Sequence, residues 1–130
     1  MIVESENPTL YSKLGGHEGI LEFLKPFYMD IRQHDILGPI FNSKIHDWDK
    51  HLEKITEFWA LQTGGPTHYR GGFAAAHLRI GAEEEHFKHW LELWEFNCKR
   101  QLSEDLTNQM IALAHEFASR LKRVINTYQR

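Results

Sequence analysis

Histidine and tryptophan are the residue types of this sequence that could most readily carry chemistry. The chain of 130 residues contains nine histidines and four tryptophans, an excess for its length. Histidine is the commonest metal ligand in proteins, and tryptophan either fills cores or lines flat apolar cavities. Most histidines of a globular protein are solvated, so their spacing has to decide whether any of these has a function.

The sequence gives little support for several well-known kinds of metal and catalytic site. A structural zinc site is not expected, because the sequence has no CxxC or HExxH motif and Cys98 is its only cysteine. A di-iron site needs Glu-x-x-His on two helices, and only Glu83 with His86 provides it, followed by His89. A nucleophile elbow and a phosphate-binding GxxxxGK loop are also missing. These interpretations are therefore weak or set aside.

One further pattern combines lone polar residues with apolar surroundings. His77 lies in the apolar segment FAAAHL, His51 shares a helix face with Ile55 and Phe58, and Tyr28 lies among leucines. A haem has two broad apolar faces, an iron that binds one neutral imidazole, and propionates that pair with cations. A buried histidine with an ordinary structural role explains the same pattern. The residues alone leave both interpretations open.

Helical spacing of apolar residues dominates the sequence, and no alternating strand pattern is found. Four principal helices are predicted. They cover about Glu18–Gln33, Trp48–Gln62, a segment from Glu83 to Cys98, and a C-terminal segment from Leu106 to Tyr128.

Turn and capping residues separate these helices. Gly15 and Gly16 follow a short helical turn over Leu10–Leu14, and Gly64–Pro66 ends the second principal helix. Ser103 is a predicted cap for the C-terminal helix, and Pro26 is expected to kink the first principal helix.

Composition places limits on the class of protein. The length predicts a single domain spanning residues 1–130, with an all-α fold. A net charge of -3 gives no field that would attract nucleic acid or an anionic membrane. The N-terminus does not resemble a secretory signal, and no apolar run is long enough to span a bilayer. A single cysteine fits a reducing compartment, so a cytoplasmic location is expected.

Four stretches carry a resemblance to a known family: FYMDIRQHDILGPIF, DWDKHLEKITEFWA, AAAHLRI and HFKHWLELW. In this order and separation they resemble the truncated haemoglobins, which are short globins with a two-over-two helical fold. The resemblance extends from about Leu10 to Tyr128. Trp48 with His51, then Phe58-Trp59 and Trp90, is most similar to the third group of that family.

The resemblance implies a role for each residue near the iron of a haem. His77 matches the proximal iron ligand. Tyr28 matches the distal tyrosine, and Trp90 matches a tryptophan whose indole N–H can point at a bound ligand. His51 matches the distal histidine position, where it could donate to the ligand, gate the pocket or bind the iron itself.

Other matched residues concern the haem as a whole. Phe41 matches the phenylalanine that packs flat on the porphyrin, and Ile55 and Phe58 are expected to line the pocket. Lys54 and Arg79 match positions where a cation can meet a propionate. The remaining histidines are expected to be surface or packing residues: His17, His34, His46, His68, His86, His89 and His115.

Two glycine motifs depart from the third group. LGG at Leu14–Gly16 and GGP at Gly64–Pro66 resemble motifs of the first and second groups. The subgroup therefore combines features of more than one group.

The function implied by the resemblance is reversible binding of O₂, and of CO or NO, at the iron of haem b. O₂ transport is one expected role. The alternative is a redox enzyme, a NO dioxygenase or a peroxidase, which would need an external reductase. No contact with nucleic acid or membrane is expected.

Overall fold

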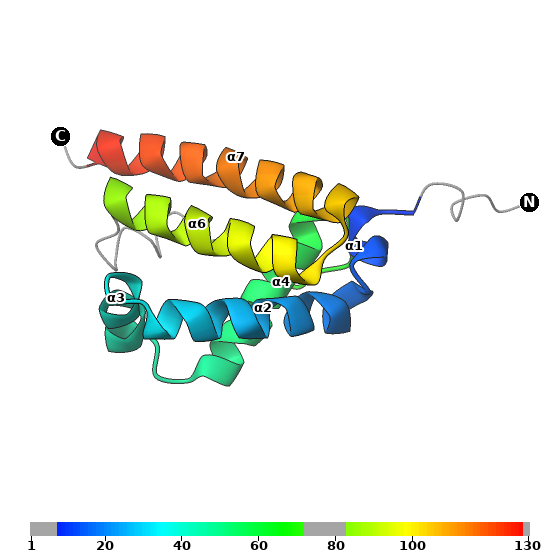
Figure 1. Cartoon of the computed structure of the whole chain (residues 1–130), viewed down its shortest axis with the longest axis horizontal. Helices are drawn as coiled ribbons and strands as arrows, with labels where there is room; N and C mark the ends of the chain where they lie inside the picture. Colours follow the sequence, from blue (N-terminus) through cyan, green and yellow to red (C-terminus); the bar gives the residue numbers. More distant parts are fainter. Residues whose placement is uncertain (1–7, 72–82, 129–130) are drawn as a thin grey trace, which may run out of the picture. The chain divides into compact units, whose positions relative to one another are not determined.

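The computed structural model describes residues 8–71 and 83–128, with side chains described as far as Val124. These residues form helices and connecting turns without any β-strand, which confirms the all-α class. The helices are α1 (Leu10–Lys13), α2 (Gly16–Gln33), α3 (Leu37–Lys44), α4 (Trp48–Gln62), α6 (Glu84–Gln101) and α7 (Glu104–Tyr128) (Figure 1). None of these helices is both long enough and apolar enough to cross a membrane.

The four long helices correspond to the four predicted ones, and their ends follow the expected signals. Helix α4 has the predicted bounds: the Asp47 side chain accepts a hydrogen bond from the N–H of Lys50 at 3.1 Å, and Gly64 follows its end with a φ of 93°. Ser103 caps α7 as predicted, because its Oγ accepts from the N–H of Leu106 at 3.3 Å. Helix α2 continues through Pro26.

Helix α3 is an addition to the four principal helices that the sequence predicted. Pro39 lies in the first turn, where its missing N–H needs no partner. The Nδ1 atom of His34 accepts a hydrogen bond from the N–H of Leu37 at 3.2 Å and so satisfies the start of the helix. A Cβ on Gly38 would lie 2.7 Å from the carbonyl oxygen of Arg32, so only glycine allows this close approach.

The described residues divide into two compact units, and α2 contributes to both. The first unit contains residues 8–26 and 47–70, which include α1 and α4. The second contains residues 27–46, 71 and 83–128, which include α3, α6 and α7. The assignment of the chain to a single domain stays a prediction.

In the second unit α6 and α7 form a hairpin and lie side by side (Figure 1). Trp94 of α6 is fully buried, and its indole N–H donates to the carbonyl of Met110 on α7 at 3.0 Å. Its ring stacks on Trp90 at a centroid distance of 5.0 Å and meets the edge of Phe27 at 5.0 Å. One side chain thus joins α2, α6 and α7.

A buried amide fixes α6 against α2. The Nδ2 of Asn97 donates to Asp30 on α2 at 3.0 Å and to the carbonyl of Leu93 at 2.9 Å, while its Oδ1 accepts from Arg100 at 2.6 Å. Asn97 is fully buried, so each of these bonds offsets the cost of removing its amide from water.

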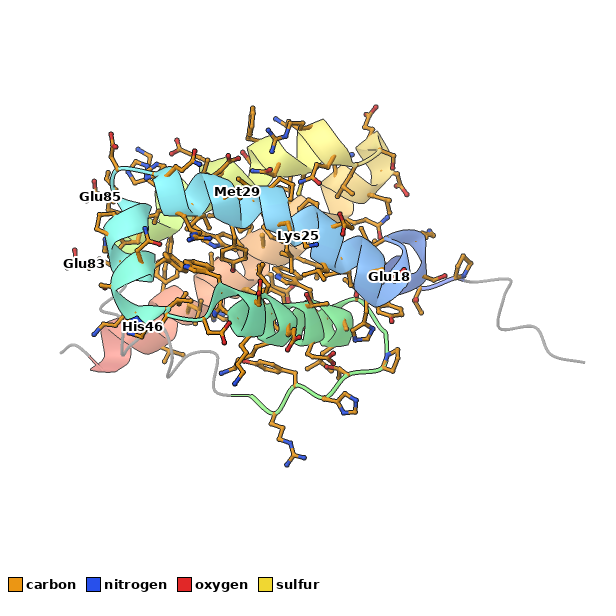
Figure 2. All side chains as sticks on the ribbon, turned by 90° about the horizontal axis from the view of Figure 1, so that it is seen from below. Glu18, Lys25, Met29, His46, Glu83 and Glu85 are labelled. Carbon is orange, nitrogen blue, oxygen red and sulfur yellow. The ribbon has the colours of Figure 1, made fainter. Side chains whose placement is uncertain are left out.

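One side of helix α2 is exposed to solvent, opposite its buried apolar residues. Glu18, Lys25 and Met29 mark this exposed side in Figure 2. The alternation of such residues with the buried Ile20, Leu24, Phe27 and Ile31 gives the helix one apolar face.

The single cysteine is expected to be inert in the folded protein. Cys98 is fully buried, and burial, followed by the nearby charge of Glu95, raises the pKa of its thiol to about 12. Ellman's reagent at pH 8 should therefore react slowly with the native protein and rapidly after unfolding in urea. Equal rates in both conditions would contradict the buried placement.

Candidate functional site

Tyr28 on α2 is a buried polar group of the second unit. It is 5% exposed, and burial raises the pKa of its phenol above the usual range. The indole N–H of Trp90 donates a hydrogen bond to its oxygen, which lowers the pKa by a smaller amount. The phenol therefore stays protonated at neutral pH and keeps an O–H donor in an environment of low dielectric constant.

Aromatic rings surround this phenol. The ring of Phe27 meets it edge-on at 5.0 Å, and Phe41 of α3 lies at a centroid distance of 6.3 Å. Trp90 of α6 in turn meets Phe27 at 5.2 Å. These rings exclude water from the phenol and surround its hydrogen-bond donor with apolar groups.

The structure thus brings together three residues that the sequence predicted for one site, Tyr28, Phe41 and Trp90. Helix packing explains the arrangement, because the Asn97–Asp30 bond sets the register of α6 against α2. The prediction omitted Phe27, which is fully buried and contacts both polar aromatic residues. The spacing of Leu24 and Ile31 on the inner face could have revealed it, since Phe27 lies three residues after the first and four before the second.

In the first unit, α4 carries the other described residues of the predicted site. His51 is half-buried, with its Nε2 atom shielded from solvent, and its ring meets Trp48 edge-on at 5.5 Å. Ile55 is half-buried one turn later, and Phe58 is buried at the next turn. Their common side of α4 is the face that the sequence predicted.

Lys54 is exposed on α4. A cation in that position can meet an anionic group at the protein surface, as its predicted role requires. His77 and Arg79, the predicted iron ligand and the second propionate partner, lie outside the described residues.

Two of the histidines predicted to be surface or packing residues, His86 and His89, have structural contacts at α6. The N–H of Glu83 donates to Nδ1 of His86 at 2.8 Å, which closes the first turn of α6. His89 lies within 3.3 Å of Glu92 and 3.8 Å of Glu85. Among the described residues no group of three or more histidine, cysteine, aspartate or glutamate side chains could hold a metal ion.

Comparison with known proteins identifies the family. The family model for bacterial-like globins matches residues 9–122. The group 3 truncated hemoglobin ctb of Campylobacter jejuni is 31% identical over 116 residues, which cover 85% of this chain and 91% of that protein.

Solved structures agree with this match. The crystal structure of the group III truncated hemoglobin from Campylobacter jejuni superposes with a TM-score of 0.80 and covers 87% of this chain and 93% of its own. The group II truncated hemoglobin from Bacillus anthracis is 21% identical, with a TM-score of 0.76 over 88% of this chain and 90% of its own, and shares the fold. The chain therefore belongs to the truncated haemoglobins, bacterial-like globins that bind haem and small diatomic ligands.

Proposed function

We propose that this globin binds O₂ reversibly, with a haem b held by His77 as the iron ligand. The observation that carries the proposal is the buried, protonated phenol of Tyr28 among aromatic rings, with the indole N–H of Trp90 on its oxygen. Bound haem would supply an iron that takes up a diatomic molecule. The side chains around the iron would then set the affinity for each diatomic molecule.

The side-chain chemistry of the residues proposed for this site suits a haem. Phe41 supplies a flat ring beside Tyr28 in the second unit, while Ile55 and Phe58 supply apolar side chains on α4 in the first. Lys54, exposed on α4, suits a propionate, and Arg79 is proposed for the same role. These residues would hold the group by apolar contact and by charge.

Tyr28 is proposed to donate its O–H to the ligand. O₂ held in such a pocket carries partial negative charge, whereas CO is nearly nonpolar, so the donor favours O₂. Trp90 is proposed to act on the same ligand, directly or by orienting the phenol through the hydrogen bond to its oxygen. On α4, His51 is a further polar side chain, and its Nε2 is shielded from solvent.

The second candidate is a redox enzyme, either a NO dioxygenase or a peroxidase. His51 favours it, since a shielded imidazole can transfer a proton during cleavage of a peroxide bond. Such turnover would need electrons from a reductase. Steady consumption of NO or peroxide by the purified protein with a reductant, lost in His51→Leu, would support this candidate over simple O₂ binding.

We propose a cytoplasmic location for either activity.

Visible absorption spectroscopy tests the haem and its ligand. The purified protein should show a strong Soret band that shifts when CO is added to the dithionite-reduced form. His77→Ala should lose this band, because the iron loses its imidazole, whereas His46→Ala, which alters an exposed histidine, should keep it. A colourless protein that takes up no added haem would contradict the proposal, and so would a His77→Ala variant with the wild-type spectrum.

A further inference from the structure

The two glycine motifs, Leu14–Gly16 and Gly64–Pro66, hold one side chain in place, that of Tyr11. Gly15 and Gly16 have φ values of 99° and 70°, in the left-handed region that glycine adopts without strain. They turn the chain between α1 and α2 so that the rings of Tyr11 and His17 meet edge-on, with centroids 5.3 Å apart.

The second motif lies against the Tyr11 ring. A Cβ on Gly65 would lie 2.3 Å from Cδ1 of Tyr11, so the backbone there packs directly on the ring and excludes any side chain. The N–H of Tyr11 donates to the carbonyl of Thr63 at 2.9 Å. Ring and backbone of Tyr11 are therefore both fixed within the first unit.

The hydroxyl of Tyr11 begins a chain of three hydrogen-bonded side chains. It is hydrogen-bonded to Nδ1 of His17, and Nε2 of His17 lies 3.0 Å from Oε2 of Glu57 on α4. A carboxylate can only accept, so Nε2 carries the hydrogen. In the neutral imidazole the lone pair of Nδ1 then faces the phenol, which donates to it.

The carboxylate at the end of this chain is held in its ionised form. Oε1 of Glu57 accepts a hydrogen bond from the N–H of His68 at 2.8 Å. This bond lowers the pKa of Glu57, burial opposes it, and His17 lowers the pKa further. A negative charge at this position stabilises positive charge on the imidazole of His17.

The chain of side chains is also accessible from solution. The side chain of His17 is 36% exposed, and Tyr11 is half-buried. Tyr28 differs in both respects, because it is buried and has at its oxygen an indole N–H, which donates and cannot take up a proton. The surroundings of Tyr11 thus provide a base where those of Tyr28 provide a donor.

We propose that Tyr11 is a redox site that gives up one electron to a strong one-electron oxidant from solution while His17 takes up its proton. An oxidised phenol is a strong acid, so its oxidation is easier when a base already accepts its hydrogen bond. The partly exposed network of Tyr11, His17 and Glu57 supplies this base and its counter-charge.

Electrons and protons balance in this step. The phenol ring loses one electron to the oxidant, and the O–H proton moves from Oη to Nδ1. The products are a neutral tyrosyl radical, an imidazolium paired with Glu57, and the reduced oxidant. A one-electron reductant such as ascorbate then returns the electron, and the proton moves back from Nδ1 to Oη.

Flash oxidation of the full chain tests the site. Ruthenium tris-bipyridine, photo-oxidised in the presence of persulfate, supplies the oxidant, and freeze-quench electron paramagnetic resonance detects the tyrosyl radical. We expect Tyr11→Phe to remove most of the radical signal. The matched control Tyr69→Phe, whose ring packs edge-on against Phe58 at 5.2 Å, should keep it.

His17→Gln separates proton transfer from a merely structural role. A glutamine amide can accept from the phenol and donate to Glu57, but it is no base. This variant should keep the wild-type thermal stability and lower the rate of radical formation at least about tenfold. Should it fail to fold, Glu57→Gln, which removes the counter-charge, should lower the rate in the same direction.

Two results would overturn the proposal: a wild-type radical yield in Tyr11→Phe, or a wild-type rate in folded His17→Gln. Either result would identify the network as a structural contact only. The oxidant comes from solution, so neither result bears on the proposed haem, which the Soret band tests separately.

Discussion

Replacement of Tyr28 by phenylalanine is expected to speed O₂ release from the reduced protein by about 10- to 100-fold. A hydrogen bond to a partly charged group contributes about 1.5–3 kcal/mol, and 1.4 kcal/mol corresponds to about a tenfold change in rate. The change removes only the hydroxyl, which burial keeps protonated at neutral pH. Laser photolysis and stopped-flow mixing measure the release rates of O₂ and CO.

Release of CO provides the internal control for this prediction, because CO accepts little from a donor. Its rate should change far less than that of O₂. Trp90→Phe removes the indole N–H from the Tyr28 oxygen and should raise the O₂ rate as well, by a smaller factor. Equal acceleration of O₂ and CO release in Tyr28→Phe would indicate a change of access and would contradict the donor role.

Replacement of Trp94 by alanine is expected to lower the free energy of unfolding by about 3–5 kcal/mol, the usual cost of deleting a large buried aromatic side chain. Trp94 is fully buried, stacks on Trp90 and donates to the carbonyl of Met110. The loss is a large part of the roughly 5–15 kcal/mol that stabilises a typical domain. Urea unfolding followed by circular dichroism measures it.

Phe96 offers a matched control on the same helix. It is 54% exposed, with the guanidinium of Arg100 over its ring at 5.0 Å. Phe96→Ala should therefore change the unfolding free energy by less than about 1 kcal/mol. A loss in Trp94→Ala as small as this would contradict the placement of Trp94 at the centre of the second unit.

Periodicity predicted the long helices well because apolar spacing is a strong signal over many residues. Helix α4 begins and ends at the predicted residues, where an aspartate cap and a glycine turn mark its limits. Helix α3 escaped prediction, since its start depends on a hydrogen bond to His34 and on a close approach at Gly38. Neither feature leaves a periodic pattern in the sequence.

The candidate site could likewise be predicted from the sequence only in part. Tyr28 and Trp90 could be predicted because a resemblance supplied their roles, and the structure adds that the indole donates to the phenol. The network of Tyr11, His17 and Glu57 could not be predicted, because Glu57 lies 40 residues from His17 and no motif links them. His17 was expected to be a surface or packing residue, and its partners are visible only in three dimensions.

The buried amide of Asn97 also limits how this protein can diverge. An apolar residue at position 97 would remove the amide donor from Asp30 and the acceptor from Arg100 in a single step. Lineages that replace Asn97 are therefore expected to lose the acid at position 30 first or at the same time. The three positions would then be inherited as a set, so that coordinated replacement at them traces the pairing of α2 with α6 through the history of the family.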